Sequence, residues 1–173
     1  MSVKTNGFVR TAVIGLAIAA CIQGAFMLFS QFYGLGIDPQ SGQRSTPHQL
    51  FLIIKNDTSP VVGELFAFST DDRHTPWFTD MQMVKRVVAS EGSKVHIDDG
   101  SLIVDGVPLA DRNQRILDKI ADKRPGYALS FPSETTVPAG QYLMLTDSED
   151  GFDGRYWGFV DQSAIRGRAV PLY

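Results

Sequence analysis

Three features of the sequence could carry chemistry. Lys85 stands inside an apolar run that predicts a β-strand, where a charged side chain is costly. Ser45 stands upstream, in a Ser-Thr-Pro stretch that precedes another apolar run. Residues 153–158, Asp-Gly-Arg-Tyr-Trp-Gly, form a combination that composition alone would rarely produce. A serine and a lysine in such settings could act as a nucleophile and its general base in acyl transfer.

The lysine can serve as a base only in a special environment. With its ordinary pKa near 10.4, a lysine amine is almost fully protonated at neutral pH and cannot accept a proton. Burial disfavours the charged amine and can lower this pKa by several units. Apolar neighbours that could provide burial are Met81, Met83, Val84, Val87 and Val88. Lys85 is therefore the candidate general base, and the competing interpretation is a lysine that keeps an edge strand soluble.

The serine stands in the sequence Arg44-Ser45-Thr46-Pro47-His48-Gln49-Leu50-Phe51. This stretch resembles the nucleophile motif of the bacterial signal peptidases, which are membrane-anchored serine proteases with a Ser/Lys dyad. Their conjugative-transfer (TraF-type) branch shows Ser-x-Pro-x-Gly-Leu-Tyr, and the housekeeping enzymes carry one more residue between serine and proline. The resemblance implies that Ser45 is the catalytic nucleophile and Lys85 its base, and a plain loop serine is the alternative.

A second stretch also resembles this family. Residues 146–158 read Thr-Asp-Ser-Glu-Asp-Gly-Phe-Asp-Gly-Arg-Tyr-Trp-Gly, against Gly-Asp-Asn-x-x-x-Ser-x-Asp-Ser-Arg-Tyr-Trp-Gly in the housekeeping enzymes, with a one-residue deletion. Glycines replace both motif serines, including the one that supports the lysine amine in the family. Ser148 or a backbone carbonyl could hold Lys85 instead. Asp147, Asp153 and Arg155 are expected to be structural and to fix this loop near the dyad.

The resemblance further implies donors for an oxyanion. The backbone N–H of Ser45 is the first candidate. Family members often carry a hydroxyl two residues before the nucleophile, where this chain has Gln43, and Ser41 is another candidate. His48 is close enough in sequence to leave a Ser/His pairing open. The three histidines form no spaced cluster, and we expect neither a metal nor a cofactor.

Composition narrows the class of protein. The 173 residues suit one domain with a short appendage, and the net charge of −3 provides no strong field for nucleic acid. Cys21 is the only cysteine, so an internal disulfide cannot form. The sequence therefore points away from nucleic-acid binding and from disulfide-stapled folds.

The N-terminus predicts a membrane anchor. Residues 11–29 carry no charge, and such a helix would span roughly 28 Å, close to the hydrocarbon thickness of a bilayer. Lys4 and Arg10 precede it, which places residues 1–10 in the cytoplasm by the positive-inside rule. We expect an anchor at 11–33 and an extracytoplasmic peptidase domain at 34–173. A cleaved signal and a lipoprotein signal ending at Cys21 are the alternatives.

The remaining sequence predicts a mainly β ectodomain with a short helix, on one N-terminal transmembrane helix. Strands are expected at 50–54, 64–68, 83–89, 95–97, 102–104, 107–109, 127–131, 141–145 and 156–160. Asp-Asp-Gly-Ser at 98–101 predicts a hairpin turn, and helical spacing of apolar residues predicts an amphipathic helix within 111–123. Residues 34–49 are expected to be irregular, and 70–80 a surface loop.

The resemblance implies a single-pass protein of the bacterial inner membrane with a periplasmic catalytic domain. Its partners would be membrane lipid and an exported precursor, pilin-like if the conjugative branch applies. The implied reaction is removal of a leader peptide after a small residue, through an acyl-enzyme on Ser45. The alternative is a catalytically silent relative, or a lipoprotein that scaffolds a pilus or secretion complex.

Overall fold

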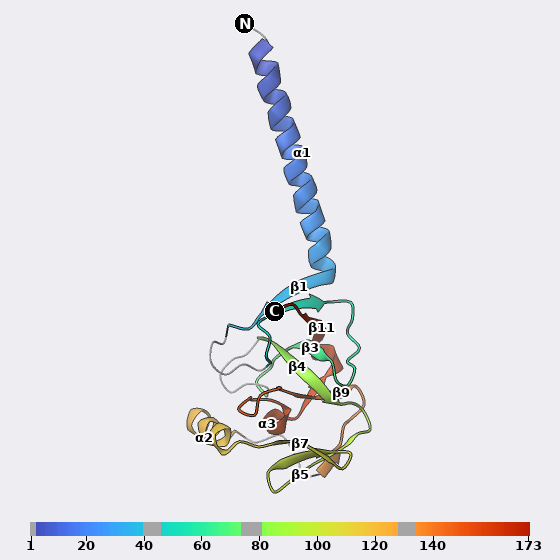
Figure 1. The fold of residues 1–173 in the computed structure, drawn as a ribbon, viewed down its shortest axis with the longest axis vertical. Helices are drawn as coiled ribbons and strands as arrows, with labels where there is room; N and C mark the ends of the chain where they lie inside the picture. The colour runs from blue at the N-terminus through green and yellow to red at the C-terminus, as the bar shows by residue number, and fades with distance from the viewer. Residues whose placement is uncertain (1–2, 40–45, 74–80, 128–133) are drawn as a thin grey trace. The chain divides into compact units, whose positions relative to one another are not determined.

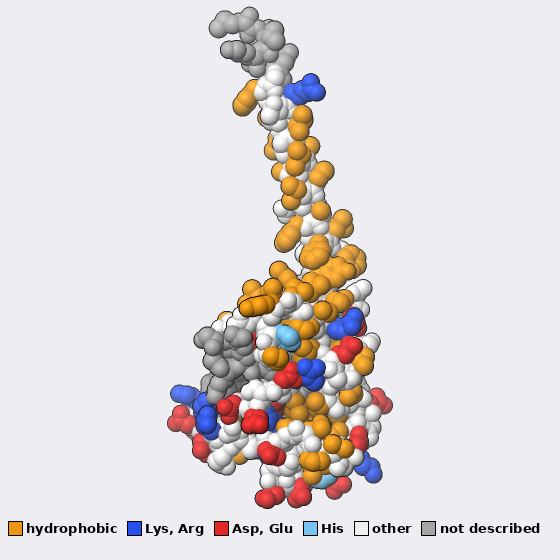
Figure 2. Space-filling view, in the orientation of Figure 1, with side chains coloured by type: hydrophobic (Ala, Val, Ile, Leu, Met, Phe, Trp, Pro, Cys, Tyr) orange, Lys and Arg blue, Asp and Glu red, His pale blue; other side chains and the backbone are white. Residues whose placement is uncertain are grey.

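A computed structural model of the chain describes residues 3–39, 46–73, 81–127 and 134–173. It divides into two units at Gly34 and Leu35, and each is considered by itself. The first is dominated by helix α1, Val3–Phe32. Its window Gly7–Phe32 has a mean hydropathy of 2.2, and none of it is buried against the protein. Figure 2 shows apolar side chains along its length, so α1 is long and apolar enough to cross a membrane.

The second unit is mainly β, as the sequence predicts (Figure 1). Its described strands form two antiparallel sheets, of seven strands in the order β1-β2-β11-β3-β4-β9-β10 and of four in the order β7-β6-β5-β8. The strands of the larger sheet are β1 Tyr33–Ile37, β2 Leu50–Ile54, β3 Leu65–Ser69, β4 Gln82–Ala89, β9 Gln141–Leu145, β10 Phe159–Asp161 and β11 Ile165–Pro171. The smaller sheet contains β5 Lys94–Asp98, β6 Ser101–Val104, β7 Val107–Asp111 and β8 Glu134–Thr136.

Local chemistry explains the parts that the sequence predicts. Asp99 and Gly100, at φ 44° and 84°, form the two-residue turn between β5 and β6, because this turn needs left-handed residues. The amphipathic helix is α2, Gln114–Lys123, which begins at its N-cap Asn113 and buries Ile116 and Ile120. The prediction of a mainly β unit with one short amphipathic helix is therefore confirmed.

Two predicted assignments are wrong. Residues 154–157 form a short helix, α3 (Gly154–Trp157), and not the beginning of a strand at 156–160. The Asp153 side chain accepts the Arg155 N–H and starts this turn, and Gly158, at φ 89°, ends it. Residues 34–49 are not all irregular, because β1 extends to Ile37. Tyr127 is not in a strand, and the rest of the expected strand at 127–131 lies outside the described residues, as does most of the expected loop at 70–80.

The core between the elements is apolar. Phe66, Phe68, Val87, Met144 and Trp157 belong to one buried cluster against the larger sheet. A second cluster joins Ala89, Leu143 and Leu145 to the smaller sheet. Strand β4 takes part in both clusters and also carries Lys85, so the lysine lies on a strand that is packed into the apolar core.

Candidate active site

Lys85 is a buried lysine on a central strand. It is 3% exposed and stands opposite Phe66 of β3, on the strand face that also carries Val87. The edge-strand interpretation is therefore wrong, because β4 lies between β3 and β9. Burial lowers the pKa of the Lys85 amine from 10.5 to about 8. A substantial fraction of this amine is thus neutral slightly above physiological pH and can accept a proton.

Four charged groups act on this amine through space. The carboxylates of Asp153, Asp38 and Asp147 raise the pKa of Lys85, and the Arg155 guanidinium lowers it, all by less than burial does. Three of these groups come from the motif at 146–158, which the fold therefore places around the lysine. The fourth group, Asp38, directly follows β1 and is far from this motif in the sequence. The balance leaves burial as the dominant influence.

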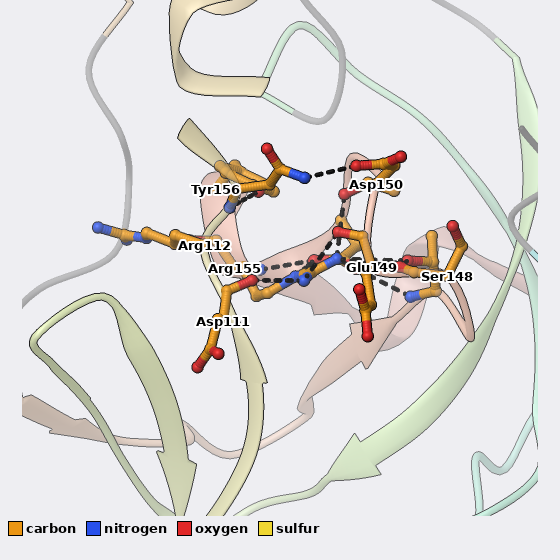
Figure 3. Close-up of polar contacts among 11 residues, drawn as sticks. Asp111, Arg112, Ser148, Glu149, Asp150, Arg155 and Tyr156 are labelled. Atoms are coloured by element: carbon orange, nitrogen blue, oxygen red, sulfur yellow. Dashed lines mark hydrogen bonds and ion pairs between the residues drawn. The ribbon is translucent and has the colours of Figure 1, made fainter. Parts of the chain in front are cut away.

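Arg155 and Asp153 form a buried ion pair. Arg155 is 1% exposed and Asp153 is fully buried, and Nε and an Nη of the arginine lie 2.9 Å from the two carboxylate oxygens. Four backbone carbonyls accept from the same guanidinium at 2.6–3.4 Å (Figure 3): that of Asp111, at the end of β7, and those of Ser148, Glu149 and Gly151 in the loop after β9. This arginine therefore joins the loop after β9 to the end of β7.

Asp147 has a different partner. Its carboxylate binds the Arg86 guanidinium through two hydrogen bonds of 2.7 Å, and Arg86 also donates to the Gly63 carbonyl at 2.7 Å. Strand alternation turns Arg86 to the opposite face from Lys85. The bidentate pair fixes the first residues of the motif loop to β4.

The segment that contains Ser45 begins and ends at described residues. Ser45, Gln43 and Ser41 themselves lie outside the described residues. The Asp38 N–H donates to the Gln49 carbonyl at 2.9 Å and closes the base of this segment. Thr46, the residue after the serine, is 3% exposed. His48 packs edge-on against Phe51, with ring centroids 6.3 Å apart.

Sequence comparison decides the family. The profile of the family described as signal peptidase, peptidase S26, matches residues 7–173. The chain belongs to the signal peptidase family.

The chain is similar to several proteins of known description. The chain is 31% identical over 116 residues to the probable signal peptidase I-2 of Synechocystis, covering 66% of this chain and 48% of that protein. It is 31% identical over 91 residues to signal peptidase I of Leptolyngbya laminosa, covering 52% and 40%. A crystal structure of a signal peptidase I from Enterococcus faecalis V583 is 26% identical, with a TM-score of 0.40, covering 64% of this chain and 96% of that one. The chain spans about half the length of the curated relatives it matches, or less.

The fold explains why this chain has glycines where the housekeeping motif of the family has serines. A Cβ added at Gly151 would lie 2.0 Å from Thr146 Oγ1, and one at Gly154 would lie 2.8 Å from the Met144 carbonyl oxygen. Neither position has room for a side chain as the loop stands. Neither position therefore supplies a side chain to the Lys85 amine.

Sequence reasoning missed several residues of this region. Arg112 Nε donates to the Arg155 carbonyl at 2.9 Å, and the Asn113 N–H donates to the Tyr156 hydroxyl at 2.8 Å. The Thr146 N–H donates to Asp153 at 2.9 Å, and the Thr146 hydroxyl lies 2.8 Å from two acceptors, Asp153 Oδ2 and the Ser148 carbonyl oxygen. A cavity of about 600 Å³ opens beside them, lined among others by Thr146, Asp111 and Arg112. Arg86, the partner of Asp147, could have been found from the sequence, because it is adjacent to Lys85 on a predicted strand. The positions of Arg112, Asn113 and Thr146 depend on loop geometry, which the sequence does not reveal.

Proposed function

We propose that this signal peptidase is a membrane-anchored serine endopeptidase that removes leader peptides from exported precursors. Ser45 would be the nucleophile and Lys85 the general base. The observation that carries the proposal is the buried Lys85, whose pKa of about 8 lets it exchange protons near physiological pH. Family membership supports the same reaction class.

Two observations support a position for Ser45 beside this lysine. The charge of Asp38, at the start of the segment that carries the serine, acts on the Lys85 amine. Thr46, which follows the serine directly, is buried within the same unit. The segment that carries the serine therefore begins within electrostatic range of Lys85 and continues into a buried residue of the same unit.

The reaction would proceed through an acyl-enzyme. Neutral Lys85 Nζ takes the proton of Ser45 Oγ while Oγ attacks the scissile carbonyl carbon. The oxyanion is held by the Ser45 backbone N–H and by the Gln43 side chain. Collapse of this intermediate breaks the C–N bond, and the leaving amine of the mature protein takes the proton from Lys85. Water, deprotonated by the same amine, then cleaves the ester and frees the leader peptide as a carboxylate.

The membrane topology belongs to the proposal. Helix α1 is long enough to span a bilayer, and Lys4 and Arg10 precede its apolar part. This places residues 1–10 in the cytoplasm, the anchor at 11–33 and the peptidase domain, 34–173, in the periplasm. The single-residue spacing between Ser45 and Pro47 favours the conjugative branch, so a pilin-like precursor is the proposed client.

The test is processing of a candidate propilin in inner-membrane vesicles by four variants of the full chain. Ser45→Ala and Lys85→Ala should each abolish cleavage. Ser59→Ala and Lys119→Ala, at exposed positions, are the matched controls and should cleave at the wild-type rate. Cleavage that survives both active-site substitutions would refute the dyad. A wild type that cleaves neither a propilin nor a general exported precursor would favour a silent, scaffolding relative.

A further inference from the structure

Thr146 lies beside the proposed general base. Strands β4 and β9 pair with Arg86 opposite Leu145 and Val87 opposite Met144. Continuing this antiparallel register by one residue sets Thr146 opposite Lys85. Facing residues of an antiparallel pair project to the same side, so Thr146 is placed on the Lys85 face.

The Thr146 side chain fills the space of the missing motif serine. A Cβ at Gly151 would lie 2.0 Å from Thr146 Oγ1, 2.5 Å from its Cγ2 and 2.6 Å from its Cβ. Gly151 does not have a positive φ, so its backbone alone does not require glycine. The motif has the reverse arrangement, with glycine at the position of Thr146 and serine at that of Gly151. Relative to the motif, position 146 has gained a side chain and position 151 has lost one.

The hydroxyl of Thr146 binds the carboxylate that most strongly attracts a proton to Lys85. Asp153 Oδ2 accepts from the Thr146 N–H at 2.9 Å and from Arg155 at 2.9 Å. Thr146 Oγ1 lies 2.8 Å from Asp153 Oδ2 and 2.8 Å from the Ser148 carbonyl oxygen, and its single proton can go to either acceptor. Asp153 Oδ1 accepts from the Arg155 N–H at 3.0 Å and from its Nε at 2.9 Å. The Thr146 N–H and three N–H donors of Arg155 meet the four lone-pair sites of this carboxylate, and the Thr146 hydroxyl is a fifth neighbour. The carboxylate therefore acts on Lys85 through space only.

We propose that Thr146 is a positioning residue: fitted against Gly151, its hydroxyl holds the Asp153 carboxylate in the ion pair with Arg155 and keeps it off the Lys85 amine. This rests on the proposed function for its role in catalysis. A carboxylate released from this arrangement would pair with the lysine and favour its charged form. The charged groups that act on Lys85 are otherwise unchanged, namely Asp38, Asp147 and Arg155.

The test compares Thr146→Val with Thr146→Ser in the full chain in detergent micelles. Valine keeps the volume against Gly151 and removes the hydroxyl, whereas serine keeps the hydroxyl. The midpoint of Lys85 titration is followed by NMR of the lysine side chain, assigned with Lys85→Met. The valine variant should titrate about one pH unit higher and cleave a peptide about tenfold more slowly at pH 7. The serine variant should keep the wild-type midpoint.

A second comparison tests the exchange itself. Gly151→Ser should destabilise the domain, because the added Cβ would clash with the Thr146 side chain. The double variant T146G/G151S removes this clash, so it should be more stable and more active than G151S. Equal Lys85 midpoints in wild type and Thr146→Val, or purely additive losses in the double variant, would overturn the inference. The NMR midpoint needs no substrate. A shifted midpoint in a chain that cleaves nothing would therefore support the placement of Thr146 while refuting the proposed function.

Discussion

Replacing Lys85 with methionine should stabilise the protein while destroying its activity. The pKa of this amine falls from 10.5 to about 8 in the folded chain, so its charged form is disfavoured there by about 3 kcal/mol. At pH 7 the amine is protonated in both folded and unfolded states, and the wild type bears this whole cost. Methionine has similar length and no charge, so Lys85→Met removes it.

The pH dependence isolates this effect from packing. Between pH 8 and 10.5 the unfolded chain retains a proton that the folded chain has lost, so wild-type stability rises with pH. The advantage of methionine should thus shrink from about 3 kcal/mol at pH 7 to about 2 at pH 9 and below about 0.5 at pH 10.5. A pH-independent packing difference shifts all three values equally and cancels in their comparison.

The assay is denaturant unfolding of the full chain in micelles, followed by the fluorescence of buried Trp157 in a Trp77→Phe background. Lys119→Met removes an exposed amine and serves as the control for the loss of one positive charge. An advantage of Lys85→Met that stays constant between pH 7 and 10.5 would refute the reasoning, as would a stability loss that grows toward neutral pH.

Three further outcomes follow from the same geometry. The kcat/KM of the wild type on a peptide substrate should rise about tenfold per pH unit and level off above about pH 8, and a flat profile would contradict a lysine base. Arg155→Leu leaves a buried carboxylate without its cation and should cost about 3–5 kcal/mol in denaturant unfolding. Its control, Arg115→Leu, removes an exposed pair and should cost less than about 1 kcal/mol. Gly154→Ala sets a Cβ 2.7 Å from Leu143 Cδ1 and should lower stability by about 1–3 kcal/mol, and thermal unfolding at the wild-type temperature would count against this packing.

The elements predicted correctly from the sequence are those with strong local signals. Strand β2 is a run of large apolar residues, and the β5–β6 hairpin carries its own turn residues. Strand β11 was missed although it lies between β2 and β3. Its inward positions include Gly167 and Ala169, which give little apolar signal. Glycine is needed there because a Cβ at 167 would lie 2.3 Å from the Ile54 carbonyl oxygen, a contact that no periodicity reveals.

The residues of the candidate site likewise include some that could be predicted from the sequence and some that could not. Lys85 could be found from the sequence, because a lysine amid apolar strand residues is costly and so calls for a reason. The fit of Thr146 onto Gly151 could not, because it depends on how a loop folds back on itself. The short helix α3 likewise depends on a side-chain cap by Asp153, which overrode the strand-like composition of Arg-Tyr-Trp-Gly.

The protonation of the three buried charged groups in this region is linked. A small β unit buries Lys85, Asp153 and Arg155 almost completely, and isolated buried charges are strongly unfavourable. Asp153 and Arg155 neutralise each other through two hydrogen bonds, and the loop carbonyls and Thr146 fill their remaining sites. Asp153 forms no direct pair with Lys85, so burial outweighs the attraction of this carboxylate and lowers the pKa of the amine to about 8. The ion pair thus stabilises the loop and occupies Asp153, as the proposed role of Lys85 as a general base requires.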